Sequence, residues 1–411
     1  MIKKILKWIG LLLLLVLLLI GLFIYNTFAQ FDKLKQGELQ ENFTQDTIPF
    51  RFHPTTGHIL IDVKINNSDK SYPFFLDSGA SNYVFKNFTK ENPLAGNGFA
   101  FSMGATGNMY FTRIRKIPSL QIGAATFKAL NAEESTLNWD CVDDIYGLIG
   151  ADIMRHLVWE IDFRKQIIVL SKQLDNQKIN SQAIKIPITG TKYTSFIDAS
   201  LKFRHNRHTK QVRIDLGNSG ILSMNESFLT EDGLNFKKKG VTGMGSKGLG
   251  YANNNMSLNE KYYLVDSLIF NNGEYAIKNI PIKASPNNFN LLGLGFFKVY
   301  KTTISWQDKV ILLAPYDTVQ NFVQKTYGFS TEYNEQKNIV EVESITENMP
   351  ASKAGLPLFS EVVSINQKTF TDVQSYCDYS PSKSTNDTMN IVIRHNDSIQ
   401  EFTLVKTLLF D

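Results

Sequence analysis

The feature that most constrains this fold is an internal repeat, in which three blocks of sequence recur in the same order. Residues 57–81 resemble 193–219, residues 118–130 resemble 266–278, and residues 148–170 resemble 291–313. The third pair aligns without a gap, with 143 residues separating Gly150 from Gly293 and Ile161 from Ile304. Chance similarity between β-segments does not explain three matches in one order. We therefore expect one structural unit that occurs twice.

Each copy consists of short β-type segments separated by Gly, Asn and Asp turns, so the body is expected to be mainly β. The repeat places a first lobe at residues 49–180 and a second at 181–318. A chain of 411 residues suffices for two to four folding units.

Both copies carry an aspartate between an apolar strand and a glycine turn, Asp77 in the first and Asp215 in the second. In one copy alone, such an acid is an ordinary turn residue. In two copies related by a pseudo-twofold axis, the carboxyl groups would meet. Two carboxyl groups about 3 Å apart share one proton, so one can act as a base toward water while the other polarises a peptide carbonyl.

These segments resemble the aspartic proteases, retropepsin-like and pepsin-like. The resemblance is carried by FLDSGAS at 75–81, by IDLGNS at 214–219, and by the later elements Leu148-Ile149-Gly150 and Leu291-Leu292-Gly293. It implies a pseudo-twofold, bilobal β-barrel fold that hydrolyses protein or peptide substrates without a cofactor or metal. The implied catalytic residues are Asp77 and Asp215, with Ser78, Gly79, Gly217 and Asn218 in support.

Leu216 departs from the family pattern, which has Thr or Ser after each catalytic Asp. Ser78 can brace the pair through its hydroxyl, whereas Leu216 has no side-chain donor or acceptor. Asn218 is a candidate substitute partner for a carboxylate. The alternative hypothesis is a second lobe with a non-catalytic role, in a peptide-binding scaffold of the cell envelope.

In the family a β-hairpin flap covers the cleft. The candidate in lobe 1 is residues 101–110, with Gly104 and Gly107, and its counterpart is residues 240–248, with Gly243 and Gly245. Glycine would permit motion and close approach to a peptide. An ordinary glycine-rich hairpin explains each segment equally well.

Residues 325–411 resemble a PDZ domain of the bacterial type. The resemblance is carried by MPASKAGL at 349–356 and by EVVSIN at 361–366. It implies a loop around Gly328 and Phe329 that binds the C-terminus of a peptide, which adds a strand to the sheet edge. The alternative is a domain that only packs against the lobes.

The amino terminus predicts a membrane-spanning helix, because Trp8–Tyr25 contains no charged residue. At about 1.5 Å per residue this run covers roughly 27 Å, the thickness of a bilayer core. The preceding lysines place the body outside the cytoplasm. We favour an uncleaved single-pass anchor over residues 1–29 because signal peptides have shorter apolar cores; a secreted or periplasmic product of signal cleavage is the alternative. Residues 30–48 are expected to be a tether.

Charge and cysteine content exclude several classes of protein. Of the net charge of +4, three units come from Lys3, Lys4 and Lys7, which leaves a nearly neutral body that is untypical of a nucleic-acid binder. Cys141 and Cys377 are too few for a disulfide framework or a multi-cysteine metal site. They could pair only if their domains touch, and two free thiols are the expectation.

Overall fold

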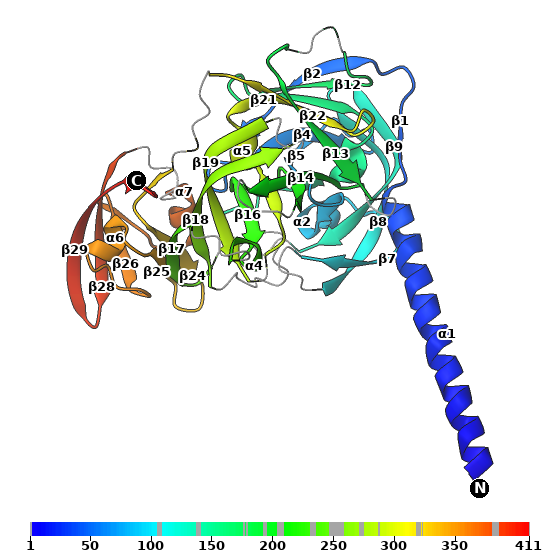
Figure 1. Cartoon of the computed structure of the whole chain (residues 1–411), viewed down its shortest axis with the longest axis horizontal. Helices are drawn as coiled ribbons and strands as arrows, with labels where there is room; N and C mark the ends of the chain where they lie inside the picture. Colours follow the sequence, from blue (N-terminus) through cyan, green and yellow to red (C-terminus); the bar gives the residue numbers. More distant parts are fainter. Residues whose placement is uncertain are drawn as a thin grey trace.

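The computed structural model describes most of the chain. The described residues are 2–104, 109–136, 141–175, 177, 180–191, 195–203, 209–230, 236–245, 259–270, 275–286, 288–317, 322, 324–379 and 386–410. As expected, the body is mainly β, and one long helix projects from it (Figure 1).

The first half of the chain contains the long helix, two short helices and twelve strands. These are α1 (Ile2–Leu34), β1 (Glu38–Leu39), β2 (Gln45–Pro49), β3 (Arg51–Phe52), β4 (Ile59–Ile65), β5 (Ser71–Leu76), β6 (Tyr83–Phe85), α2 (Lys86–Glu91), β7 (Gly96–Met103), β8 (Met109–Ile122), β9 (Ala125–Ser135), β10 (Gly147–Ile149), α3 (Ala151–Met154), β11 (Val158–Asp162) and β12 (Ile167–Ser171).

The second half repeats this series. It contains β13 (Ile184–Gly190), β14 (Ile197–Phe203), β15 (Lys210–Asp215), β16 (Leu222–Asn225), α4 (Ser227–Thr230), β17 (Lys237–Gly243), β18 (Lys261–Phe270), β19 (Tyr275–Ser285), β20 (Leu291–Gly293), α5 (Leu294–Phe297), β21 (Tyr300–Ser305) and β22 (Val310–Pro315).

Each half closes six strands into a barrel. In lobe 1 the strands pair in the order β4, β5, β10, β6, β9, β8 and back to β4. In lobe 2 the corresponding order is β14, β15, β20, β16, β19, β18 and back to β14. The parallel pairs also correspond, β5–β10 with β15–β20 and β6–β9 with β16–β19. The sequence repeat is therefore also a repeat of strand topology.

A six-stranded antiparallel sheet, in the order β2, β12, β11, β21, β22, β13, joins the two lobes. At its centre Trp159 pairs with Ile304, and Ile161 pairs with Thr302. Since 143 residues separate the equivalent positions, each lobe presents the same strand to the other. Such a self-complementary contact is the signature of a twofold arrangement. One continuous hydrophobic core fills both lobes.

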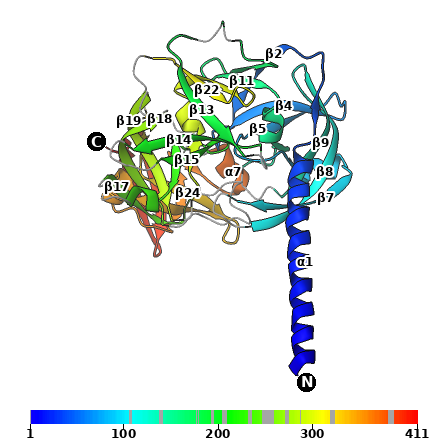
Figure 2. The same ribbon diagram turned by 45° about the vertical axis from the view of Figure 1, so that its right-hand side comes forward.

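The C-terminal unit has a separate hydrophobic core. Its elements are β23 (Lys325–Thr326), β24 (Phe329–Asn334), β25 (Ile339–Thr346), α6 (Pro350–Lys353), β26 (Glu361–Ile365), β27 (Lys368–Thr369), α7 (Val373–Asp378), β28 (Thr388–His395), β29 (Ser398–Val405) and β30 (Thr407–Leu408). Figure 2 shows this unit against lobe 2.

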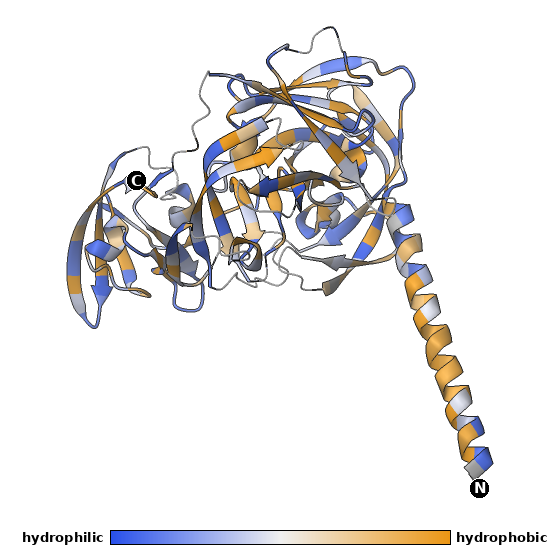
Figure 3. Cartoon of the chain, viewed as in Figure 1, coloured by the Kyte–Doolittle hydropathy of each residue, from blue (hydrophilic) through white to orange (hydrophobic). Residues whose placement is uncertain are grey.

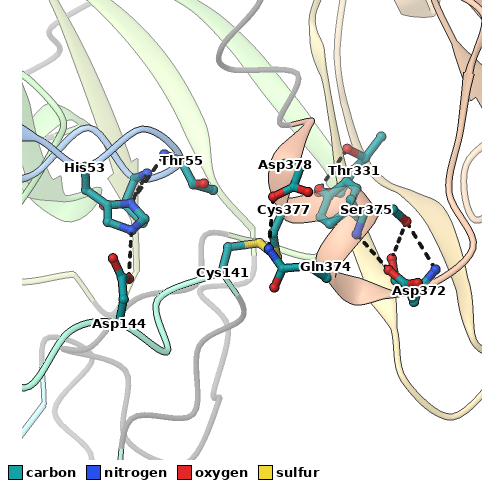
Figure 4. The surroundings of a disulfide bond; sticks show 12 residues. His53, Thr55, Cys141, Asp144, Thr331, Asp372, Gln374, Ser375, Cys377 and Asp378 are labelled. Carbon is teal, nitrogen blue, oxygen red and sulfur yellow. Dashed lines mark hydrogen bonds and ion pairs between the residues drawn. A yellow bond between two sulfur atoms is a disulfide. The ribbon is translucent and has the colours of Figure 1, made fainter.

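The C-terminal unit is attached to both lobes. Strand β17 of lobe 2 pairs with β25, Val241 opposite Thr346 and Gly243 opposite Ser344. On the other side, Cys141 of lobe 1 forms a disulfide with Cys377 of α7 (Figure 4). The expectation of two free thiols is therefore wrong. Their positions 236 residues apart gave no indication of this contact, which depends on how the C-terminal unit packs.

The sequence analysis expected residues 30–48 to be a tether, and the structure shows that they are not. Helix α1 continues to Leu34, whose side chain is buried against Ala100 and Ile114. Beyond it, β1 pairs with β9 and β2 pairs with β12. The polar composition of this segment reflects edge strands whose side chains are partly exposed.

The apolar run near the amino terminus is helical, as expected. The segment Lys3–Leu34 is long and apolar enough to cross a membrane (Figure 3). An anchor and a signal sequence both have this character. A disulfide is also typical of proteins outside the cytoplasm.

Candidate active site

Asp77 and Asp215 follow corresponding strands of the two barrels. Strand β5 runs parallel to β10 and leads into Asp77, whose N–H donates to the carbonyl of Ile149 at 2.9 Å. Strand β15 runs parallel to β20, with Asp215 opposite Gly293. The apolar-apolar-Gly elements thus hold the two acid-bearing strands in register.

The carboxyl groups of Asp77 and Asp215 lie next to each other at the lobe boundary, so the fold brings the two predicted residues together. Backbone N–H groups surround the pair. Gly79 N donates to Asp77 Oδ1 at 2.7 Å, and the backbone of Gly217 contacts both carboxyl groups. Asp215 Oδ1 is buried and has no hydrogen-bond partner among the described residues.

The two glycines let the carboxyl groups approach each other. A Cβ on Gly79 would lie 2.5 Å from Asp215 Cγ, and a Cβ on Gly217 would lie 2.2 Å from Asp77 Cγ. The glycine of each lobe therefore lies directly against the carboxyl group of the other lobe. Any side chain at either position would separate the pair. The supporting role predicted for both glycines now has a steric basis.

Burial and mutual repulsion raise the pKa of the pair. Burial raises the pKa of Asp77, and hydrogen bonds from Gly79, Asp215 and Gly217 oppose this. Burial, then repulsion from Asp77, raise the pKa of Asp215 well above its usual range. The two carboxyl groups therefore titrate as a coupled pair that retains a proton at higher pH than an isolated aspartate would. Both residues remain partly accessible to solvent.

Ser78 braces the pair across the lobe boundary. Its Oγ donates to the carbonyl of Ile214 at 2.8 Å and accepts from the N–H of Leu216 at 3.0 Å. The Leu216 side chain is fully buried in the shared core. The hydroxyl of Ser78 therefore makes both side-chain hydrogen bonds from lobe 1. The equivalent side chain of lobe 2, Leu216, contributes only packing.

Asn218 does not take the place of the missing hydroxyl. Its Nδ2 donates to Ser223 Oγ at 3.0 Å, and its Oδ1 accepts from Gly220 N at 3.0 Å. Its carbonyl accepts from Leu294 N at 2.7 Å. Asn218 thus stabilises the turn after Asp215.

His58 is a site residue that the sequence did not indicate. Its Nε2 donates to the carbonyl of Gly217 at 2.8 Å, which ties lobe 1 to the turn that holds Asp77. Burial lowers the pKa of His58 to about 4, so the imidazole is neutral near pH 7. A histidine after a turn glycine has no pattern that would have revealed this contact.

The lobe 1 flap candidate is a hairpin formed by β7 and β8. Gly107 lies outside the described residues, and Gly104 follows β7 at the end of the β7–β8 hairpin. Inside this hairpin, Ser102 and Thr112 donate hydrogen bonds to Glu133 on β9. Burial raises the pKa of Glu133. The lobe 1 hairpin is thus held to its barrel by a buried acid that the sequence analysis did not identify.

Gly243 and Gly245 lie where lobe 2 meets the C-terminal unit. A Cβ on Gly243 would lie 2.3 Å from the carbonyl oxygen of Glu343, at a φ of +108°. Met244 N donates to the same carbonyl at 3.0 Å, and Gly245 is buried. The glycine at 243 therefore permits close contact between strands, rather than the flap motion that we expected.

The groups around Gly328 and Phe329 are occupied by bonds within the chain. Gly328 N donates to Thr326 Oγ1 at 3.0 Å, and Gly328 O accepts from Thr346 N at 2.8 Å. Phe329 begins β24 and packs on the C-terminal core. Next to it, the hydroxyl of Tyr376 on α7 donates to the carbonyl of Thr331 at 2.7 Å. Helix α7 is thus bound directly to β24, where an added peptide strand was expected.

Comparison with known proteins assigns no family to this chain. No family model matches the sequence, and no curated protein matches it.

Proposed function

We propose that this protein is a membrane-anchored aspartic endopeptidase that acts outside the cytoplasm. The observation that carries the proposal is the meeting of two buried carboxyl groups, Asp77 and Asp215, which come from corresponding strands and lie against each other's glycine turns. The repeated barrels and the resemblance of the two acid-bearing turns to aspartic proteases support it. A pseudo-twofold, bilobal protease-like fold is part of the proposal.

The proposed reaction uses the two carboxyl groups in opposite protonation states. Asp77, as the anion, takes a proton from a water molecule bound between the pair, and the water oxygen bonds to the peptide carbonyl carbon. Protonated Asp215 donates a hydrogen bond to the carbonyl oxygen. The C–N bond of the tetrahedral intermediate breaks when its nitrogen accepts the proton that Asp77 took from water, which returns Asp77 to its anionic form. Ser78 and His58 hold the two turns in place.

The C-terminal unit is proposed to be a PDZ-like domain that braces both lobes through β17 and the disulfide. Recognition of a peptide C-terminus by this unit requires α7 to move away from β24, because Tyr376 occupies the Thr331 carbonyl. Protein or peptide substrates and the membrane are the proposed partners.

The test is hydrolysis of a quenched-fluorescence peptide library by the full chain from about pH 3 to 7, where aspartyl dyads titrate. Asp77→Asn and Asp215→Asn should each lower turnover by at least about 10²–10⁴-fold, since each removes one half of the acid–base pair. Asp62→Asn, on the exposed side of β4, is the matched control and should keep the parent rate. Equal turnover in all four proteins would exclude the dyad as the source of hydrolysis.

The second candidate function is a non-enzymatic scaffold that binds peptides in the envelope. Leu216 favours it, because its side chain supplies no hydroxyl to match the one that Ser78 contributes from lobe 1. A library peptide that the full chain binds but does not cleave at any pH in that range would support the scaffold.

A further inference from the structure

Helix α1 is fixed to lobe 1 by contacts along its last turns. Lys33 Nζ donates to the carbonyl of Asn97 at 3.1 Å, and Asn131 Nδ2 donates to the carbonyl of Lys33 at 2.9 Å. Leu34 is only 1% exposed. Because no linker separates helix from barrel, the direction of the helix sets the orientation of the whole body.

Strand β7 runs back along this helix toward its amino-terminal end. Asn97 lies beside Lys33, and the ring of Phe101 lies 5.9 Å from that of Phe23. Four strand residues cover about 13 Å and ten helix residues about 15 Å, so the two segments lie nearly side by side. Figures 1 and 2 both show β7 next to the upper turns of α1.

The outer face of the β7–β8 hairpin is apolar where it reaches Phe23. Phe99, Met109 and Phe111 are each at least 60% exposed, and Phe111 packs on Phe101 at 4.9 Å. The next side chain on the same face of β8 is Arg113, which is exposed. Along β8, apolar side chains near the hairpin end therefore give way to a cation nearer the body, which lies opposite Phe99 of β7.

We propose that this apolar edge, formed by Phe99, Phe101, Met109 and Phe111, lies in the interface of the same bilayer that α1 spans. The inference rests on the anchor in the proposed function. Phe23 belongs to the uncharged run Trp8–Tyr25 and lies about 3 Å inside its outer end. A side chain in contact with Phe23 is therefore at the depth where aromatic rings concentrate, and Arg113 extends toward the headgroups.

The two faces of the hairpin fit this position. The inner face bonds to Glu133 through Ser102 and Thr112, while the outer face has exposed rings in contact with α1. The β7–β8 hairpin, which contains the flap candidate of lobe 1, thus lies at the membrane surface. Substrate segments that reach it come from proteins held at the same membrane.

The test measures lipid contact with single fluorescent labels on the full chain in lipid nanodiscs. Cys141 and Cys377 are joined, so a thiol-reactive environment-sensitive dye labels only an introduced cysteine. Phe111→Cys and, independently, Phe99→Cys report on the hairpin. Val405→Cys is the matched control, a half-exposed apolar residue on β29 of the C-terminal unit. Leu15→Cys reports on α1.

Nitroxide lipids labelled near the headgroup should quench the dye at 111 and 99 several-fold more than at 405, with emission shifted to the blue. Equal quenching at positions 111, 99 and 405 would overturn the inference. If acyl-chain nitroxides still quench the Leu15 label strongly, α1 spans the membrane and only the placement of the hairpin is wrong. No quenching at Leu15 would contradict the anchor itself. Adding Asp77→Asn should change none of these values, so loss of peptidase activity does not affect the test.

Discussion

Ser78 shows how one side chain can stabilise a boundary between two lobes. Its hydroxyl satisfies a buried carbonyl and a buried N–H on the opposite strand, both within 3.0 Å. The side chain at the corresponding position of lobe 2, Leu216, contributes only buried apolar surface. The brace is therefore asymmetric although the strands around it are repeated.

Ser78→Ala is expected to lower the free energy of unfolding by about 1–3 kcal/mol for each backbone group that loses its partner. Urea denaturation followed by fluorescence measures this change. Ser181→Ala, at an exposed position, is the control and should leave the midpoint unchanged. If both variants unfold at the same urea concentration, Ser78 does not act as a brace.

The carboxyl pair and His58 give opposite dependences of stability on pH. The raised pKa of Asp215 means that the native state binds more protons than the unfolded state above about pH 3.8, so its contribution is lost as the pH rises. The pKa of His58, lowered to about 4, makes the native state harder to protonate, so that contribution is lost as the pH falls from 6.5 toward 4.

Asp215→Asn is therefore expected to stabilise the protein at pH 7 while abolishing hydrolysis, because it removes a buried repulsion with Asp77. Each pKa unit removed corresponds to about 1.4 kcal/mol. Thermal unfolding at pH 4 and pH 7 measures the effect, which should be larger at pH 7. Asp62→Asn, an exposed carboxylate, serves as the control. A variant that is less stable than the parent at pH 7 would contradict the shared proton.

Among the elements, β17 has the most unexpected role. The repeat predicts that it corresponds to β7, and each forms a hairpin with the strand that follows, β18 or β8. However, β17 also adds to the sheet of the C-terminal unit through β25. In lobe 2, one of the glycines that suggested a flap, Gly243, permits close contact between two backbones.

Helix α7 is held by the disulfide at Cys377 and by Tyr376, which bonds to β24 (Figure 4). Near the Cys141 end, Asp144 Oδ1 lies 3.9 Å from His53 Nε2. Two adjacent residues of one short helix thus connect the C-terminal unit to lobe 1 and to its own sheet.

The double variant Cys141→Ser/Cys377→Ser is expected to lower the free energy of unfolding by about 2–4 kcal/mol, because the closed loop is long. Hydrogen exchange should increase in α7 more than in the barrels. The parent treated with a reductant is the matched comparison and should behave like the variant. Unchanged protection in α7 would show that β17 and Tyr376 alone hold the unit.

At the scale of the whole molecule, helix α1 joins lobe 1 without a free linker between them. Leu34 belongs to the helix but is buried with Ala100 and Ile114 of lobe 1. The apolar helix and the proposed catalytic body therefore form one connected structure. Figure 3 shows the apolar helix entering the body directly.

Leu34→Ala is expected to lower the free energy of unfolding by about 2–4 kcal/mol, because it removes a buried side chain from a packed cluster. Denaturation of the full chain in detergent measures the loss. Leu18→Ala, at an exposed position of the same helix, is the control and should leave the stability of the body unchanged. Equal stability of the two variants would show that the last turn of α1 contributes nothing to the body.

The sequence alone determined the mainly β character, the duplication, the long apolar helix and the positions of Asp77 and Asp215. These features depend on local patterns: alternation of apolar residues, a charge-free run, and similarity between segments a fixed distance apart. The repeat was informative because two similar chains tend to fold alike and to pack by one symmetric contact, as Trp159 and Ile161 do in the central sheet.

Only the tertiary structure decided which groups meet across domain boundaries. The Cys141–Cys377 bond, the contact of His58 with Gly217, and the pairing of β17 with β25 join residues far apart in the chain. Such contacts depend on how finished elements pack, and no local pattern encodes them. For the same reason, residues 30–48 have the composition of a tether but are held by partners from β9 and β12.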